Sequence, residues 1–143
     1  MVKFKSILLF LSAKAVGFFA RLTKDIAHLG DGQTIEFDTV VTNEGNAYDP
    51  RHDHFIAPVA GLYQISVSIM SIPNQNIHCR ILKNGVMVSQ LYGALADYDA
   101  DTQVIVLDLQ AGDMIWVVHS GGGNERINIY NSYFSGFLIK QHF

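Results

Sequence analysis

The sequence predicts an all-β protein that folds as a single sandwich domain. Three observations point to this class. Apolar and polar residues alternate in short stretches, most clearly over residues 63–69, and turn-forming residues recur every eight to twelve positions. No stretch has a sustained helical period. Alternation is typical of strands with one buried face, and many short strands with turns between them form sandwiches. A length of 143 residues is that of one domain with its own core.

In the first half of the chain, turn signals separate the expected strands. Gly30-Asp31-Gly32 indicates a loop over residues 28–33, and Gly45 indicates a turn within residues 43–50. Pro58 ends a strand because it cannot donate a hydrogen bond to a ladder. Gly61 is interpreted as the turn that precedes the alternating stretch. The expected strands are residues 16–22, 34–41, 55–57 and 62–72.

The second half contains the clearest hairpin signal. Asn84-Gly85 is the dipeptide preferred by two-residue hairpin turns, and it joins the apolar segments 77–82 and 86–91. Residues 73–76 form the loop before this hairpin. Three further strands are expected over residues 102–109, 113–120 and 127–139.

The aromatic and turn residues have a recognisable spacing. They begin at Phe37 and continue through Asn43, Tyr48, Phe55, Gly61 and Tyr63. Later blocks contain Leu107, Leu109, Gly112, Asp113 and Trp116, then Phe134 with the segment 135–139. This pattern resembles the globular C1q domain, which shares its fold with tumour necrosis factor ligands. Ile65 and Val67 depart from it, because the family prefers aromatic residues there. The resemblance implies a ten-stranded jelly-roll sandwich of the C1q/TNF type that assembles as a homotrimer.

Composition narrows the class of partner. Hydrophobic residues make up 49% of the chain and charged residues 16%, a balance that favours an oligomer whose interface covers apolar surface. The net charge is −3 and Lys and Arg do not cluster, which argues against nucleic acid or an anionic membrane as partner. The single cysteine, Cys79, alternates with isoleucines and is expected to be a buried thiol.

The N-terminal residues are expected to lie outside the domain. Residues 1–13 combine two lysines with a short apolar run and are interpreted as an N-terminal extension or a residual signal segment, with residues 14–143 as the globular domain. An extra strand or helix packed on the domain is the alternative. The run is too short to span a bilayer, so no membrane insertion is expected. Together with the resemblance, this segment predicts a secreted, extracellular protein.

Three polar groups are candidate binding sites. The first contains Arg51, His52 and His54, expected in a loop. Histidines two positions apart on an extended chain point the same way and could hold a transition metal together with Asp53, although two ligands are fewer than a closed site needs. These residues are therefore predicted as ligand-binding, with a solvated loop as the alternative.

The second group is acidic and predicts a metal site. Asp97, Asp99 and Asp101 alternate around Tyr98, and carboxylate oxygens are the ligands that calcium prefers. In calcium-binding relatives an acidic or amide residue precedes the late leucine strand, and Asp99 matches that place best. The resemblance implies a calcium ion near the trimer apex, with Asp99 from more than one subunit. An acidic loop that keeps the protein soluble is the alternative.

The third group follows three glycines and is expected to bind sugar hydroxyls. Asn124, Glu125 and Arg126 offer hydrogen-bond donors and acceptors, and nearby exposed Tyr92 and Tyr98 offer stacking surface. A simple connector is the alternative.

No sequence pattern combines a nucleophile, a base and an orienting group, so no enzyme is expected. The predicted function is that of a secreted, lectin-like pattern-recognition protein of innate immunity that binds carbohydrate or microbial surface ligands as a trimer. Display of three weak sites would increase avidity. The alternative is a cytokine-like or matrix ligand that binds a protein receptor.

Overall fold

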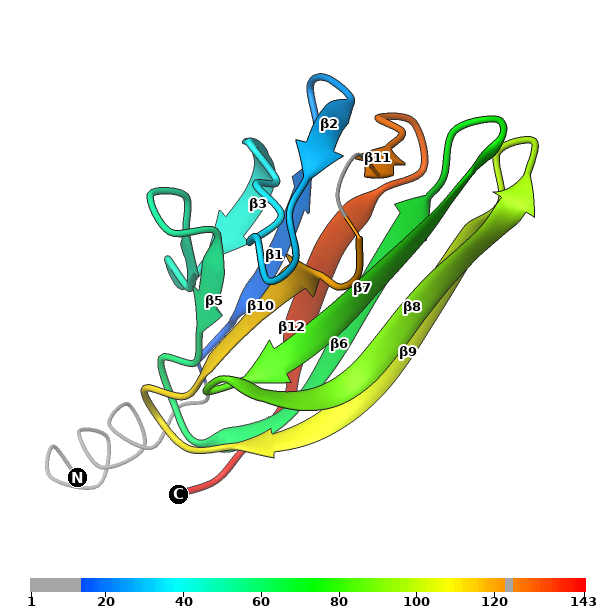
Figure 1. Cartoon of the computed structure of the whole chain (residues 1–143). Coiled ribbons are helices and arrows are strands. Elements are labelled where there is room, and N and C mark those ends of the chain that lie inside the picture. The colour runs from blue at the N-terminus through cyan, green and yellow to red at the C-terminus, as the bar shows by residue number, and fades with distance from the viewer. Residues whose placement is uncertain (1–13, 123–124) are drawn as a thin grey trace, which may run out of the picture.

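The chain folds into two stacked antiparallel β-sheets (Figure 1) in the computed structural model, which describes residues 14–122 and 125–143. Five strands form each sheet. The first sheet has the order β3 (Thr39–Glu44), β1 (Gly17–Arg21), β12 (Tyr133–Gln141), β6 (Gly61–Met70) and β9 (Ala100–Leu109). The second has the order β4 (Tyr48–Asp49), β5 (His54–Ile56), β10 (Met114–His119), β7 (Gln75–Lys83) and β8 (Val86–Ala96). The all-β sandwich is thus confirmed.

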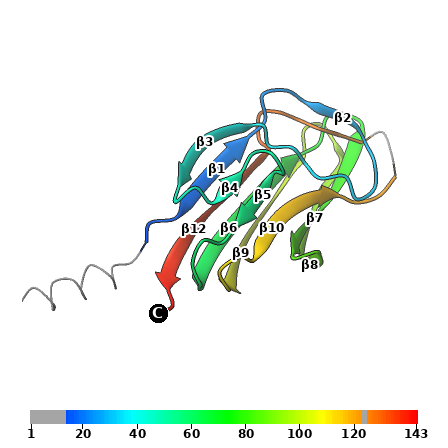
Figure 2. The same ribbon diagram turned by 90° about the vertical axis from the view of Figure 1, so that its left-hand side faces the viewer.

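The neighbours within each sheet are mostly distant in sequence. Seen from the side (Figure 2), β1, β12, β6 and β9 succeed one another, although β12 closes the chain and β1 opens it. A separate ribbon of two short strands, β2 (Ile26–Leu29) and β11 (Glu125–Ile127), is added to these ten strands. Within the described residues, no helix is long and apolar enough to cross a membrane.

The core between the sheets is built from the spaced aromatic residues. Phe18 packs against three other rings, with ring centroids 4.8 Å from Phe134, 5.1 Å from Phe55 and 5.4 Å from Tyr48. All four side chains are at least 97% buried. The spacing of Asn43 and Tyr48 also has a cause, because the Asn43 side chain donates to the Tyr48 carbonyl and accepts from the Tyr48 amide.

The hairpin prediction is confirmed, whereas the role expected of Gly61 is wrong. Asn84 and Gly85 both have positive φ, as the expected hairpin turn requires, and β7 pairs with β8 across them. Gly61 is not a turn residue, because it is already paired in the ladder as the first residue of β6, opposite Leu109. A Cβ there would be 2.5 Å from the Lys140 carbonyl oxygen, so close approach of β12 explains the glycine.

Two expected strands differ from those observed. In residues 34–41 the ladder begins only at Thr39, and the earlier part pairs through a single bridge between Thr34 and Val118. Residues 127–139 are not one strand, because the chain turns between β11 and β12. The Ile129 amide donates to the Asp25 carboxylate and the Tyr130 amide to the Asn128 side chain. These side-chain acceptors replace strand partners.

Candidate functional site

The loop of Arg51 and His52 is organised around one carboxylate, that of Asp49. Asp49 accepts hydrogen bonds from the Arg51 amide at 2.9 Å and the Arg51 Nε at 3.2 Å, and its other oxygen lies 2.9 Å from His52 Nδ1. Hydrogen bonds from His52 and then Arg51 hold the pKa of the Asp49 carboxyl well below its usual range. The Arg51 side chain is still 83% exposed. Arg51 and Asp49 also line a cavity of about 310 Å³ in front of Tyr48.

His54 leaves this loop and packs on the outer face of the second sheet. Its ring is stacked on Trp116, with centroids 4.3 Å apart and planes 16° apart. Burial, and then repulsion from His52, lower the pKa of His54, so its ring is neutral at pH 7. The His52 and His54 rings are 6.3 Å apart. Among residues 14–122 and 125–143, no three His, Cys, Asp or Glu side chains gather as metal ligands would.

The calcium candidates lie at the turn between β8 and β9, with Asp97 and Asp99 in the turn and Asp101 in β9, and two of them accept hydrogen bonds from backbone amides. The Asp99 carboxylate accepts from the Ala94 amide at 2.6 Å, and the Asp101 carboxylate accepts from the Tyr92 amide at 2.9 Å. The Asp101 bond joins β9, the outermost strand of the first sheet, to β8, the outermost strand of the second, and the Asp99 bond holds the turn before β9 to β8. Asp97 and Tyr98 are exposed. The calcium site stays a prediction. In such a site, Asp99 and Asp101 would have to bind calcium while they also accept these backbone hydrogen bonds.

Glu125 is a partly buried structural residue of β11 rather than an open loop residue, with its side chain 14% exposed. Its Oε2 lies 2.7 Å from Nε2 of the fully buried His119 and accepts from the His78 amide at 3.2 Å. His119 Nδ1 is 2.9 Å from the Gly30 carbonyl oxygen, so this network connects β10, β7 and the loop after β2. Arg126 is exposed, and Asn124 lies outside the described residues.

The three predicted groups do not form one site. The β4–β5 turn and the β8–β9 turn lie on opposite sides of the molecule (Figure 1), and β11 lies apart from the former. Asp53, expected as a possible metal ligand beside the histidines, is instead 91% buried and has a φ of 58°. Burial raises the pKa of its carboxyl to about 6. The sequence feature that points to this burial is the spacing of five residues between Tyr48 and Asp53. The Tyr48 hydroxyl lies 3.2 Å from Asp53 Oδ1.

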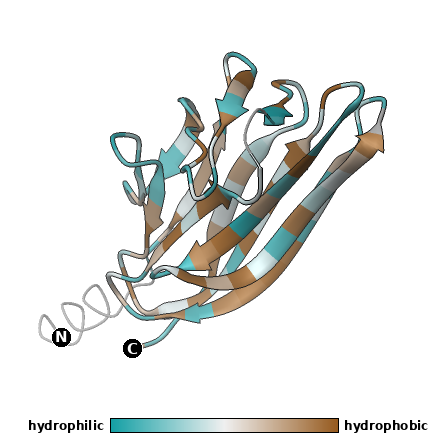
Figure 3. Cartoon of the chain, in the orientation of Figure 1, coloured by the Kyte–Doolittle hydropathy of each residue, from teal (hydrophilic) through white to brown (hydrophobic). Residues whose placement is uncertain are grey.

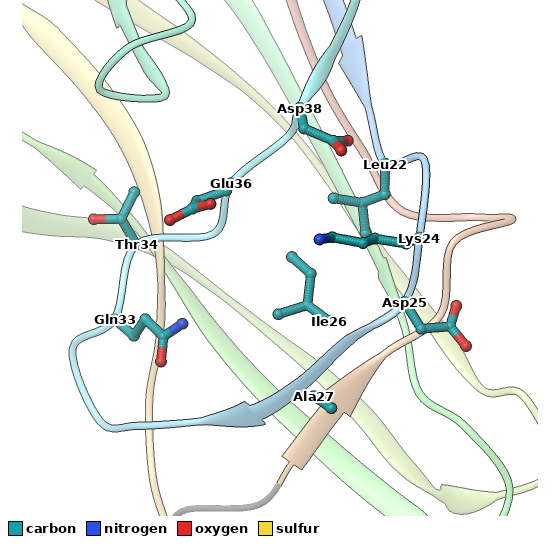
Figure 4. Close-up of a pocket in the computed structure, with 9 residues that line it drawn as sticks. All are labelled: Leu22, Lys24, Asp25, Ile26, Ala27, Gln33, Thr34, Glu36 and Asp38. Carbon is teal, nitrogen blue, oxygen red and sulfur yellow. The ribbon is translucent and has the colours of Figure 1, made fainter.

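A larger cavity of about 490 Å³ was not expected from the sequence. It lies between the segment 22–27 and the segment 33–38 (Figure 4). Ile35 and Phe37 point into the core, so the residues that alternate with them, Thr34, Glu36 and Asp38, point outward into this cavity. The alternation predicts a strand, but its polar half lines a pocket.

Cys79 is buried as expected, and burial raises the pKa of its thiol well above the usual range. It is therefore a core residue with little thiolate at neutral pH.

Comparison with known proteins identifies the family. Residues 17–139 match the model of the C1q domain. The chain is 32% identical over 112 residues to human complement C1q and tumor necrosis factor-related protein 9A, an alignment that covers 73% of this chain and 33% of that protein. It is 30% identical over 127 residues to mouse complement C1q tumor necrosis factor-related protein 3, covering 87% of this chain and 51% of that protein. The chain thus spans a third to a half of the length of these relatives.

Solved structures show the same fold. The globular domain of zebrafish complement 1qA superposes with a TM-score of 0.71 over 89% of this chain and 99% of that one, at 17% identity. Eiger TNF from S. frugiperda superposes with a TM-score of 0.72 over 92% of this chain and 96% of that one, at 12% identity. These likenesses confirm the jelly-roll architecture predicted from the sequence. With its aromatic core, its ten-stranded sandwich and a family match over residues 17–139, the chain belongs to the C1q domain family.

Proposed function

We propose that this protein is a secreted, homotrimeric recognition protein of innate immunity that binds carbohydrate or microbial surface ligands. The observation that carries the proposal is an apolar surface that one subunit cannot bury. It spans β8, β9 and β12, and its side chains are 38–69% exposed. Its members are Val86, Val88, Leu95, Val104, Val106, Phe137 and Ile139.

Strand register places the members on β9 and β12 on one face of the first sheet. Val106 lies opposite Gln64 in β6, and Gln64 lies opposite Phe137 in β12, so the two apolar side chains are on one face with one polar residue between them. Figure 3 shows apolar residues recurring along β8 and β9. Domains of the C1q/TNF type form trimers, and burying the four members on β9 and β12 would contribute roughly 4 kcal/mol per subunit.

Recognition in the proposed trimer belongs to the loops and the outer faces that this interface leaves free. Those regions present Arg51, Arg126 and the exposed Tyr98, together with the calcium candidates of the β8–β9 turn. Weak sites repeated three times suit ligands that are themselves repetitive, such as polysaccharides. Calcium, if it contributes, would be shared between subunits near the threefold axis.

Binding to an array of microbial glycans, with calcium and with chelator, tests this function. The proposal predicts binding to several polysaccharides by protein with the mass of a trimer. A trimer that binds no glycan on the array would contradict it.

One observation favours a protein receptor as a second candidate. A cross-strand row on the outer face of the second sheet contains His54, Trp116, Leu82 and the 46% exposed Met87. Such a partly apolar row suits a protein partner. A single partner bound at nanomolar affinity and lost in Met87→Glu would support this candidate over the first.

A further inference from the structure

The cavity of about 490 Å³ beside β2 has two polar walls and an apolar floor (Figure 4). Thr34, Glu36 and Asp38 form one wall, and Lys24 projects from the opposite side toward Glu36. Ile26 contributes aliphatic surface, whereas Leu22 is 1% exposed and belongs to the core. Its volume lies within the range of about 300–1,000 Å³ that is typical of small-molecule sites.

Some of the polar side chains of this cavity are committed to the fold and hold its walls. The Asp38 carboxylate accepts hydrogen bonds from the amide and the hydroxyl of Thr23. The Asp25 carboxylate accepts from the Ile129 amide at 2.7 Å, and Gln33 Oε1 accepts from the Gly30 amide at 3.0 Å. These bonds hold the segments 22–27 and 33–38 in place, so the cavity exists before any ligand binds.

Two charged groups of the cavity make no hydrogen bond or close ion pair with other described residues, although Lys24 attracts the Asp38 carboxylate at longer range. Within the described part of the chain, neither Lys24 Nζ nor the Glu36 carboxylate makes a hydrogen bond or an ion pair within 4.0 Å. The Gln33 amide is held through its oxygen, so its NH₂ group remains available to donate. The cavity thus offers an acceptor at Glu36, donors at Lys24 and Gln33, and a hydroxyl at Thr34 that can do either.

The charges that line the cavity restrict the chemical class of ligand that it can bind. Three carboxylates and one ammonium group belong to the lining, so the cavity disfavours anionic molecules. Neighbouring hydroxyl groups of a sugar ring both donate and accept, which matches Glu36, Lys24 and Gln33, and the C–H face of the ring matches Ile26. We infer that this cavity is a binding site for a neutral saccharide of about two or three pyranose units. The inference rests on the carbohydrate recognition proposed above and assigns its site.

Saturation-transfer NMR of the full chain tests the assignment with neutral trisaccharides of glucose, mannose and galactose, and with trigalacturonate as the acidic comparator. We expect at least one neutral probe to bind and trigalacturonate not to bind. Glu36→Gln keeps the shape but weakens the acceptor, and Ala27→Phe fills the cavity. Each should weaken binding by about tenfold or more. Glu44→Gln, an exposed carboxylate in β3 outside the cavity, is the matched control and should bind as the unsubstituted chain does.

The possible outcomes separate this inference from the function on which it rests. If a neutral probe binds and both cavity variants bind it unchanged, the site is elsewhere and only this inference fails. Binding of trigalacturonate alone also overturns it. If no saccharide binds to the unsubstituted chain, the carbohydrate function fails as well. Should Ala27→Phe not fold, as judged by thermal unfolding, Glu36→Gln decides alone.

Discussion

Replacing the buried Asp53 with asparagine should stabilise the protein at neutral pH and leave it unchanged in acid. Tyr48 has one hydroxyl proton but lies 3.2 Å both from Asp53 Oδ1 and from the Phe37 carbonyl oxygen. A protonated Asp53 can donate to the Tyr48 oxygen while Tyr48 donates to Phe37, so the fold favours the neutral carboxyl. An asparagine NH₂ group can replace that donor, and asparagine tolerates the positive φ at this position.

The sign and the size of this change in the free energy of unfolding follow from the pKa of Asp53. Burial, together with repulsion from Glu36, Asp38 and Asp49, raises this pKa from 3.8 to about 6 in the folded state. A raised pKa means that the group's contribution to stability is fully present below about pH 4 and is lost as pH rises to about 6. About two units at 1.36 kcal/mol each give an upper limit of about 3 kcal/mol. Asp53→Asn should therefore raise the free energy of unfolding by about 1–3 kcal/mol at pH 7.5.

Urea unfolding at fixed protein concentration, in steps from pH 3.5 to pH 7.5, measures this difference. The gain in Asp53→Asn should begin above about pH 4 and level off above about pH 6. Asp97→Asn, at an exposed position, is the control and should stay within about 0.5 kcal/mol of the unsubstituted protein at every pH. A variant that is less stable than the unsubstituted protein at pH 7.5 would refute the reasoning, because the ionised carboxylate would then be stabilising.

Three further results are expected. Val106→Asp, in the proposed interface on β9, should convert the trimer to a monomer, as measured by light scattering. Val41→Asp, on the opposite edge strand β3, should leave the mass unchanged. A trimer in both variants would place the interface elsewhere. Glu125→Ala should lower the free energy of unfolding by about 2–4 kcal/mol, because the buried His119 Nε2 and the His78 amide lose their acceptor. The neighbouring Arg126→Ala should change this free energy little. Equal values for the two variants would count against the network. Calcium added to chelator-treated trimer should raise the midpoint of thermal unfolding, and Asp97→Asn should reduce that rise; an unchanged midpoint in the unsubstituted protein would exclude the calcium site.

Local patterns in the sequence predicted much of the fold. The alternation over residues 63–69 and the Asn84-Gly85 turn each depend on neighbouring residues alone, so β6 and the β7–β8 hairpin could be expected. The break between β11 and β12 could not, because it depends on the distant Asp25 carboxylate that binds the Ile129 amide. The sequence around Gly61 indicates a turn, because the approach of β12 depends on residues that are distant along the chain.

The site was harder to predict because a polar residue in sequence does not reveal its partners. Glu125 and Asp99 resemble free loop carboxylates, yet each accepts a backbone amide that another segment supplies. Glu36 differs from these two residues in the opposite way, because it is expected in a strand but lines a cavity. Its neighbours Ile35 and Phe37 suggested a strand, and only the fold shows that the segment 22–27 faces it across a cavity.

The central claim, that this C1q domain is a trimeric recognition protein for carbohydrate, is tested most directly by one measurement. Size-selected protein is applied to an array of neutral and acidic microbial glycans. The account predicts that a species of about 48 kDa, three times the 15.9 kDa of one chain, binds several neutral glycans and that Val106→Asp monomer binds them far more weakly. Equal binding by monomer and trimer, or no binding by the trimer, would contradict the account.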